Sequence, residues 1–458
     1  MLKVKDILKA TNGKLINGED EITITSYKID SREVNSGDFF IPLPGERTDG
    51  HKYLDMVIDN GCIGFFVSKE KIDNLDIKCF LKRNRNLIII EVEDTLKALH
   101  MIGEYNRNIH IDIPIIAVTG SVGKTSTREI ISSVLYQEKK VITTEKNMNS
   151  NIGLSLMTLK LKDQDVGIFE AGIDFVGEMD ILTNILKPEV AVITNIGTSH
   201  IGKFGSRDII YQEKTKIANG LINKKILLLN KDDSYLREYK NREVNIQYFS
   251  IDDAKNIKIN NDYIEFDTYI YNKLEHLKIN DIGEHNVLNS LIAIKIGQIY
   301  NISSQDIIKG IDRYRNFSRR MEKIKIKDFT IIDDTYNASP SSTKSGLKTL
   351  SELNYKRKIA VLADILELGD YSKEIHQDLG ECFKDLNIDI LIAYGDAIKY
   401  LVDNAKKYIS NVFYFKNENE VIEKIESIIQ KDDIIYFKGS NAMNVNKIIE
   451  HLKEDFMN

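Results

Sequence analysis

The chain has 458 residues, of which 42% are hydrophobic and 29% charged, and its formal net charge is −6 at pH 7. That length favours two to four domains of a soluble globular protein, and the acidic balance argues against a general binder of nucleic acid or membrane surfaces. No apolar run approaches the ~18 residues that span a membrane, and charges interrupt residues 1–10, so we expect neither membrane insertion nor a signal peptide. The scattered Cys62, Cys79 and Cys382 predict no disulfide framework and no metal site, which favours a reducing cytoplasm.

Residues 1–108 contain short apolar runs separated by turn residues, a pattern that predicts a small α+β domain. A helix is expected over about Asp94–Arg107. The expected strands are Glu21–Ile29, Asp38–Ile41, Cys62–Val67 and Leu87–Val92.

The stretch Ile115–Ser126 joins a β-branched apolar run to a loop with Gly120 and Gly123, then to Lys124-Thr125 and a helical pattern that reaches about Tyr136. That order builds a phosphate cradle, in which backbone N–H groups, a lysine and a hydroxyl on Mg²⁺ hold a nucleotide triphosphate. The general form has four residues between its glycines, and here there are two. A plain strand–helix turn that carries Lys-Thr is therefore the alternative.

The rest of residues 109–317 alternates apolar runs with helical stretches, which predicts βαβ units and a parallel sheet. From Val244 to Ile279 the pattern changes to short strands with charged turns, so we expect a small antiparallel flap there. Glu284–Tyr300 has the apolar face of a helix. The expected strands of the parallel sheet, beside the run before the cradle, are Lys140–Thr143, Asp165–Glu170, Glu189–Asn195 and Lys225–Leu229.

Residues 318–458 repeat the alternation without a phosphate cradle, which predicts a second, Rossmann-like doubly wound α/β domain. Its expected strands are Phe329–Asp333, Lys358–Ala363, Asp389–Ala393, Asn411–Tyr414 and Asp433–Phe437.

Polar residues at three strand ends are candidates for chemistry, because nucleotide crevices lie at the carboxyl ends of parallel strands. Glu170 ends a buried run, where it could ligate a metal ion or form a salt bridge, and His200 follows the next run as a ligand or a structural residue. Asp333 and Asp334 could bind a ribose or an incoming amine, or cap a helix.

These places and the cradle together resemble the Mur ligase family, the ATP-dependent ligases that build the peptidoglycan precursor. The family's ATP loop reads T-G-[ST]-x-G-K-[ST], which Thr119–Thr125 matches, and this accounts for the short glycine spacing. Further matches run the length of the chain: Glu170-Ala171-Gly172, Thr194-Asn195-Ile196-Gly197 followed by His200, Gly283–Asn289 and Arg320-Met321-Glu322.

Within the family, the chain most resembles the ligases that join D-alanyl-D-alanine to UDP-N-acetylmuramoyl-tripeptide through an acyl phosphate, with ADP and phosphate as products. The stretches that carry this resemblance are Asn147–Gly153, Asp333–Pro340 and Leu366–Gly369. Asp30-Ser31-Arg32 resembles the UDP-binding domain but is shared with a sister ligase, so it does not decide alone. It implies three domains: a UDP-substrate-binding domain (1–108), an ATP-binding central domain (109–317) and a domain for the incoming amino acid or dipeptide (318–458). It also implies ATP and two Mg²⁺ ions, and we expect a monomer.

The resemblance assigns roles in ATP binding position by position. Asn286 would contact the adenine, Arg320 the phosphates and Asp334 the ribose. In addition to Arg320, the residues that would hold the phosphates are Gly120, Ser121, Val122, Gly123, Lys124, Thr125 and Ser126.

The resemblance also assigns the metal and substrate residues. Thr125 and Glu170 would bind one Mg²⁺, and His200 a second, whose site a carbamylated Lys214 would complete. By its position alone, Lys214 would be an ordinary surface lysine of a helix. The implied catalytic residues are Lys124, Glu170, His200 and Lys214, and the implied substrate-binding residues are Ser31, Arg32, Asn147, Asn149, Tyr336 and Asn337.

Three positions depart from the family pattern. Arg319 stands where Gly is common, Ser339 replaces the second Asn of N-A-N-P, and Asn441 stands where Arg usually follows Lys-Gly-Ser. The last two fall where the acceptor would bind. A sister ligase that adds another amino acid, a folylpolyglutamate synthase and a non-catalytic, nucleotide-gated scaffold are the alternatives.

Overall fold

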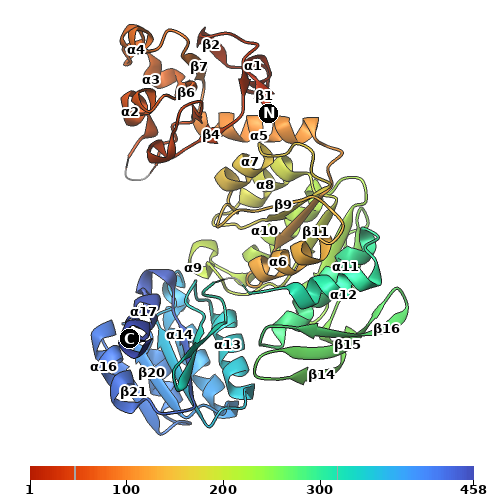
Figure 1. Cartoon of the computed structure of the whole chain (residues 1–458), viewed down its shortest axis with the longest axis vertical. Helices are drawn as coiled ribbons and strands as arrows, with labels where there is room; N and C mark the ends of the chain where they lie inside the picture. Colours follow the sequence, from red (N-terminus) through yellow and green to blue (C-terminus); the bar gives the residue numbers. More distant parts are fainter. Residues whose placement is uncertain (46–47, 317, 458) are drawn as a thin grey trace.

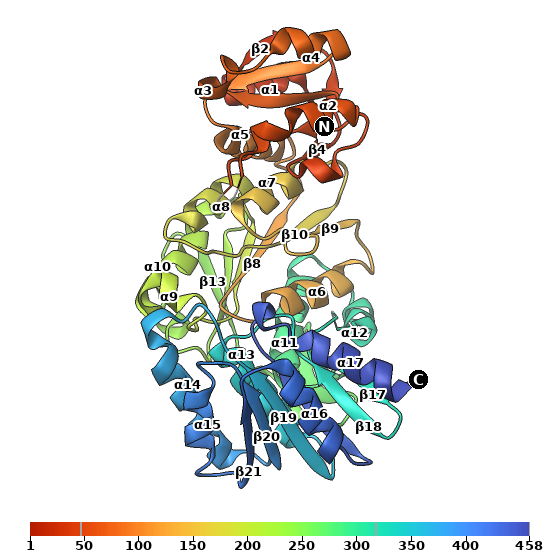
Figure 2. The same ribbon diagram turned by 90° about the vertical axis from the view of Figure 1, so that its left-hand side faces the viewer.

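The computed structural model describes residues 1–45, 48–316 and 318–457. Three α/β parts follow one another along the long axis, from the N-terminal part at one end to the C-terminal part at the other (Figures 1 and 2). Within the described part of the chain, no helix has the length and apolarity that crossing a membrane requires. The predicted boundary between the second and third domains falls at Phe317, which lies outside the described residues.

The N-terminal part is a five-stranded sheet with helices around it. The strand order is β2-β7-β6-β5-β4, and all neighbours are parallel apart from β2 and β7. The strands are β2 (Lys14–Asn17), β4 (Tyr27–Lys28), β5 (Phe39–Phe40), β6 (Gly64–Ser68) and β7 (Ile88–Val92). The helices are α1 (Val4–Thr11), α2 (Leu54–Asp59), α3 (Lys69–Ile72), α4 (Ile77–Arg83) and α5 (Thr95–Ile109).

The strand predicted over Glu21–Ile29 is two strands in two sheets. β3 (Thr23–Ile24) pairs with β1 (Leu2–Lys3), whereas β4 pairs with β5. The chain changes partner between them, where the Ser26 carbonyl accepts the Phe39 N–H at 2.9 Å. Alternating polarity indicates extended backbone but not which strand lies beside it, so the prediction was wrong about continuity.

The central part is a six-stranded, fully parallel sheet in the order β13-β12-β11-β8-β10-β9. Its strands are β8 (Ile115–Thr119), β9 (Val141–Thr143), β10 (Val166–Glu170), β11 (Val190–Ile193), β12 (Ile226–Asn230) and β13 (Asn245–Phe249). One face packs on α7 (Asn151–Thr158), α8 (Glu178–Leu186) and α10 (Arg207–Thr215), with α9 (Ile201–Phe204) at its edge. The other face packs on α6 (Lys124–Leu135), α11 (His285–Ile299) and α12 (Ser304–Arg313).

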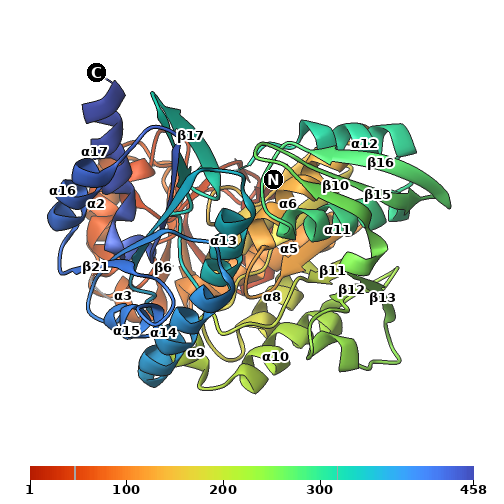
Figure 3. The same cartoon turned by 90° about the horizontal axis from the view of Figure 1, so that it is seen from below.

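A separate antiparallel sheet of β14 (Lys255–Ile259), β15 (Ile264–Ile270) and β16 (Lys273–Ile279) lies beside α11 and α12 (Figure 3). The predicted flap therefore exists but begins later than expected. β13, which the flap was expected to include, extends the parallel sheet beside β12. Its half-buried face explains why it looked like an exposed strand, since an edge strand contacts a neighbour on one side only.

The C-terminal part is a six-stranded sheet in the order β17-β18-β22-β19-β20-β21, parallel except for β17. The strands are β17 (Glu322–Ile326), β18 (Phe329–Asp333), β19 (Arg357–Ala363), β20 (Ile390–Tyr394), β21 (Asn411–Phe415) and β22 (Asp433–Lys438). Helices α13 (Pro340–Glu352), α14 (Ser372–Glu381) and α15 (Lys399–Ala405) cover one face, and α16 (Glu418–Ile428) and α17 (Val445–Met457) the other. The sequence prediction missed β17, a short amphipathic edge strand.

Candidate active site

The loop between β8 and α6 has the backbone that a phosphate cradle needs. Gly120 has φ +145°, and a Cβ there would lie 1.9 Å from Thr194 Oγ1, so no side chain fits. Gly123, at φ +83°, is the left-handed residue before the first turn of α6. The free N–H groups and the dipole of the α6 N-terminus face the loop, which makes it an anion site.

Lys124 closes this loop from inside the helix. Its Nζ donates to the Gly120 carbonyl at 2.9 Å. Burial lowers the pKa of Lys124, while Glu170 acts in the opposite direction. A lysine that is folded back on a neutral carbonyl, with no carboxylate bonded to it among the residues that the structure describes, can exchange that contact for a phosphate oxygen.

Thr125 and Glu170 form the polar pair that the sequence predicted at the strand end. Thr125 Oγ1 donates to Glu170 Oε2 at 2.8 Å, and Asn149 Nδ2 donates to Glu170 Oε1 at 2.9 Å. The pair lies at the carboxyl end of β10, directly beside the loop. A hydroxyl and a carboxylate are hard oxygen donors of the kind that Mg²⁺ prefers.

Lys214 is buried on α10, contrary to the surface position that its helical pattern suggested. Its exposed fraction is 5%, and no hydrogen bond or ion pair to its ammonium group is found among the described residues. Burial, followed by repulsion from Lys124, lowers the pKa of Lys214 well below its ordinary value. The lowered pKa favours the neutral amine, which is the form that reacts with carbon dioxide, and Lys214 lines the cleft.

His200 lies where the central and C-terminal parts meet. Its Nδ1 is 2.7 Å from Glu367 Oε2 and 3.4 Å from Asp174 Oδ1. Burial lowers the pKa of His200, and the two carboxylates act in the opposite direction. Sequence reasoning gave no site role to Asp174 or Glu367, although Glu367 stands inside one of the matched stretches.

The C-terminal part supplies the opposite wall of the cleft. Asp334 Oδ2 accepts from Lys438 Nζ at 2.6 Å and from the Tyr436 hydroxyl at 2.9 Å, which leaves Oδ1 for a ligand. Arg320 stacks on the Tyr336 ring with 4.1 Å between the guanidinium carbon and the ring centroid. The buried Nε of Arg320 has no hydrogen-bond partner within the described ranges, so a donor remains available there.

A cleft of about 440 Å³ joins these two walls. Most of the residues predicted from the sequence line it: Gly120, Ser121, Val122, Gly123, Lys124, Thr125, Ser126, Asn149, Glu170, His200, Lys214, Arg320, Asp334, Tyr336 and Asn337. Four do not line it. Ser31 and Arg32 lie in the N-terminal part, Asn147 is exposed beside the cleft, and Asn286 is buried under it.

The amide of Asn286 is used within the protein. Its Nδ2 donates to Asp281 Oδ2 at 2.8 Å and to the Ile282 carbonyl at 2.9 Å. Its neighbours His285 and Asn289 line the cleft instead. The predicted adenine contact of Asn286 therefore stays a prediction.

Asn195 is a residue of the site that sequence reasoning quoted without a role. Its Oδ1 accepts the Val122 N–H and its Nδ2 donates to the Val122 carbonyl, both at 3.0 Å. This pairing fixes the tip of the phosphate loop from the end of β11. The sequence signal that could have identified Asn195 is its place just after a buried strand and close to Gly197.

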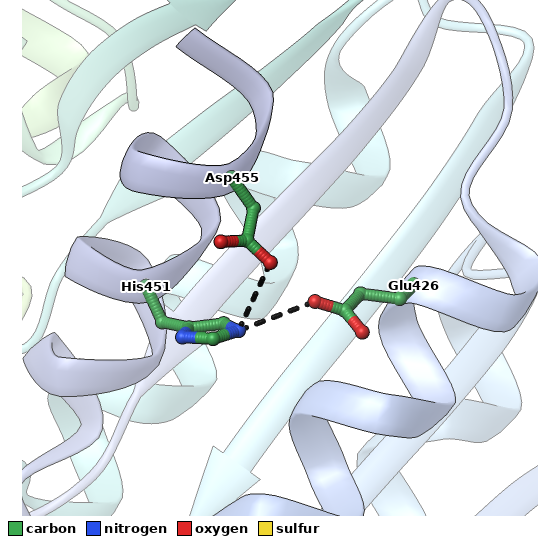
Figure 4. A group of neighbouring side chains, drawn as sticks. All are labelled: Glu426, His451 and Asp455. Atoms are coloured by element: carbon green, nitrogen blue, oxygen red, sulfur yellow. Dashed lines mark hydrogen bonds and ion pairs between the residues drawn. The ribbon is translucent and has the colours of Figure 1, made fainter. Parts of the chain in front are cut away.

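A group of three potential metal ligands lies outside the cleft, between α16 and α17 (Figure 4). His451 Nε2 is 3.2 Å from Glu426 Oε1 and 3.3 Å from Asp455 Oδ2. An imidazole between two solvent-accessible carboxylates accounts for this arrangement, and surface contacts of this kind contribute little to stability. We assign no function to it.

Comparison with family models identifies the class of protein that this fold and cleft define. Residues 23–106 match the Mur ligase family catalytic domain, residues 118–297 the Mur ligase middle domain, and residues 319–441 the Mur ligase glutamate ligase domain. The chain belongs to the Mur ligase family, and it is an ATP-dependent ligase of three α/β domains.

Individual relatives place the chain within that family. A Bacillus subtilis protein named UDP-N-acetylmuramoyl-tripeptide–D-alanyl-D-alanine ligase is 31% identical, with 98% of each chain covered, and an Escherichia coli protein of that name is 26% identical. The crystal structure of MurF from Acinetobacter baumannii is 28% identical, with a TM-score of 0.88 over 99% of each chain. The MurF ligase from Thermotoga maritima, solved in complex with ADP, is 24% identical, and its TM-score of 0.83 over 95% of this chain and 98% of its own supports the fold.

Proposed function

We propose that this ligase joins D-alanyl-D-alanine to UDP-N-acetylmuramoyl-tripeptide at the expense of ATP, which yields ADP and phosphate. The observation that carries the proposal is that the phosphate loop and the Asp334–Asn337 strand end line opposite walls of the same cleft. Relatives of that name match the chain over nearly its whole length.

We propose two Mg²⁺ ions beside the ATP phosphates. Thr125 and Glu170 fit the first, because their oxygens already lie 2.8 Å apart at the end of β10. His200 and Lys214 fit the second once Lys214 is carbamylated, since the carbamate replaces a nitrogen donor with carboxylate-like oxygens. Bound Mg²⁺ would supply charge neutralisation at the γ-phosphate.

The residues of the chain then position the reactants and stabilise charge. Lys124 and the N–H groups of the loop hold the phosphates while the substrate carboxylate attacks the γ-phosphorus. The bond to ADP breaks, and an acyl phosphate forms. The amine of the dipeptide attacks the acyl carbon, loses a proton and displaces phosphate, so that an amide results.

The remaining assignments follow the same proposal. Residues 1–108 bind the UDP group, with Ser31 and Arg32 facing it, and Asn147 and Asn149 lie toward the muramoyl-peptide. Tyr336 and Asn337 lie toward the incoming dipeptide, and Asn286 toward the adenine. The three cysteines are free, which fits a reducing compartment, and we expect a monomer in the cytoplasm.

A phosphate-release assay tests the proposal. The protein is mixed with ATP, Mg²⁺ and UDP-N-acetylmuramoyl-tripeptide, and candidate acceptors are added one at a time. D-alanyl-D-alanine should give the fastest release, together with a product of the summed mass. A faster single amino acid would indicate a sister ligase, and release that ignores the acceptor, or no release at all, would contradict ligation.

A further inference from the structure

Two loops from different domains meet backbone to backbone at the edge of the cleft. One carries His200 at the start of α9, and the other is residues 365–369 of the C-terminal part. The Gly202 N–H donates to the Glu367 carbonyl at 3.1 Å. A Cβ on Gly202 would lie 2.7 Å from the Gly369 nitrogen, so the approach requires glycine.

The two residues that face each other across this contact both have unusual backbones. His200 has φ 59° and Glu367 has φ 63°, in the left-handed region that non-glycine residues rarely adopt. Such conformations persist where the surroundings hold them, and they gather at functional sites. Here they direct the Glu367 carboxylate at the His200 ring, with 2.7 Å between Oε2 and Nδ1.

The loop that carries Glu367 is braced by the domain behind it. The Ile365 N–H donates to His376 Nε2 at 3.3 Å, and the Leu366 N–H donates to Ser440 Oγ at 2.8 Å. Leu368 is buried in the same apolar cluster as Ile201. The carboxylate is therefore presented from a fixed frame, and it moves with the C-terminal domain.

We propose that Glu367 is a positioning residue on the C-terminal domain that fixes the orientation of the His200 imidazole. His200 is then oriented to bind a cation only when the two domains are docked. The inference rests on the proposed function, in which His200 binds the second cation. Oε2 of Glu367 lies within ion-pair distance of Nδ1, while Nδ1 has no aligned hydrogen bond among the described residues. A carboxylate on that side of the ring favours the proton on Nδ1 and leaves Nε2 for the cation. Histidines that bind metal ions commonly have such a carboxylate partner.

Asp174 is the other carboxylate beside His200 Nδ1, and it differs from Glu367 in the domain that carries it. It belongs to the central domain, as His200 does, and lies farther away, at 3.4 Å. It remains next to the ring when the domains part, whereas Glu367 arrives with docking. Lys203 lies 3.8 Å from Asp174 Oδ1 and 3.7 Å from Glu367 Oε1, which reduces the repulsion between the two carboxylates.

Manganese binding provides a test that does not depend on turnover. Mn²⁺ is titrated by electron paramagnetic resonance into the full chain with a non-hydrolysable ATP analogue, for the wild type, E367Q, H200A and Y371F. E367Q keeps the side-chain size and removes the charge. Y371F is the matched control, because the Tyr371 hydroxyl donates to the Gly205 carbonyl across the same contact at 2.6 Å without touching His200. Thermal melting checks that each variant is folded.

We expect the wild type to bind two Mn²⁺ ions and E367Q to bind the second one 10- to 100-fold more weakly, as loss of such a partner does. H200A should lose the second ion, and Y371F should stay within about twofold of the wild type. Tight binding of both ions by E367Q, or equal weakening by Y371F, would overturn the positioning role and leave the proposed function intact. A wild type that binds fewer than two ions would overturn the two-ion site, and this inference with it.

Discussion

Lys214 illustrates how burial changes the chemistry of a single residue. A buried amine that has no partner among the described residues is costly to keep charged, and the lowered pKa of Lys214 reflects that cost. The sequence could not reveal this, because helical periodicity does not say which domain covers a face. On α10, which packs against α8 and α9, Lys214 is buried at the cleft that Lys124 also lines.

We predict that Lys214 carries a carbamate under bicarbonate. A ¹³C resonance of a carbamate should appear when the protein is equilibrated with ¹³C-bicarbonate, and K214A should lack it and lose about 100-fold or more in turnover. K216A is the control, because Lys216 lies two residues on, is half-buried and is paired with Asp180 and Glu213. A wild-type spectrum identical to that of K214A would refute carbamylation.

Asp281 is a second residue whose charge the fold disfavours. Burial raises its pKa from 3.8 to about 7, although bonds from the Ile282 N–H and the Asn286 amide act against the shift. The unfolded chain ionises this carboxyl above pH 4, while the folded chain retains the proton until about pH 7. Its contribution to stability is therefore complete below pH 4 and is lost as the pH rises through 7.

We predict that D281N removes this pH dependence, because an amide does not ionise. The free energy of unfolding of the wild type, relative to that of D281N, should fall by at most about 4 kcal/mol between pH 4 and pH 8. Urea midpoints of both proteins across that range provide the measurement. Parallel curves would mean that Asp281 is already ionised at low pH.

At the scale of elements, helix α5 joins the N-terminal part to the central one (Figure 1). Its fully buried Arg107 donates from Nε to the Leu186 carbonyl at 2.7 Å and from Nη2 to the Lys187 carbonyl at 3.1 Å. These carbonyls end α8, where a helix leaves acceptors unpaired and attracts positive charge.

We predict that R107M destabilises the last turn of α8 by about 2–3 kcal/mol, because it leaves buried carbonyls without donors. Hydrogen exchange of the amides in that turn should accelerate roughly 100-fold, which corresponds to that energy. K97M, on the exposed side of α5, is the control and should change stability by less than about 0.5 kcal/mol. Unchanged exchange in R107M would show that water replaces the guanidinium.

The elements also show what the sequence could and could not predict. Buried parallel strands such as β8 and β10 were found because both of their faces are apolar. Once these strands were assigned, their ends were known, and so were the positions of Glu170 and His200. Two edge strands were misread: β13 was placed in the wrong sheet and β17 was missed, since half-buried strands resemble exposed hairpins. The edge strands β9 and β21 were found. The contact of His200 with Glu367 depends on how two domains dock, which no local pattern encodes.

At the scale of the whole molecule, the contacts between the C-terminal and central domains determine how the two walls of the cleft come together. The docked domains share buried apolar residues, among them Ile201 and Leu368, and they also meet through polar groups: the Asn354 N–H donates to Asn261 Oδ1 at 2.8 Å, and Lys348 pairs with Glu284. Exposed polar contacts of this kind contribute about 0–1 kcal/mol each. Nucleotide in the shared cleft would contact both domains and should strengthen their docking.

We predict that the ligase is more open without ligands and closes when ATP analogue and UDP-N-acetylmuramoyl-tripeptide bind. Small-angle scattering should show a smaller radius of gyration with both ligands than with neither. The coupling free energy between ligand binding and domain closure should be about 1–3 kcal/mol. K124A should not close with the ATP analogue, because its loop lacks the phosphate contact of the lysine. K139A, which changes a half-buried lysine just beyond the same helix and outside the cleft, should close as the wild type does. An envelope that is unchanged by the ligands would mean that the domains are docked throughout, and the orientation of His200 would then be permanent.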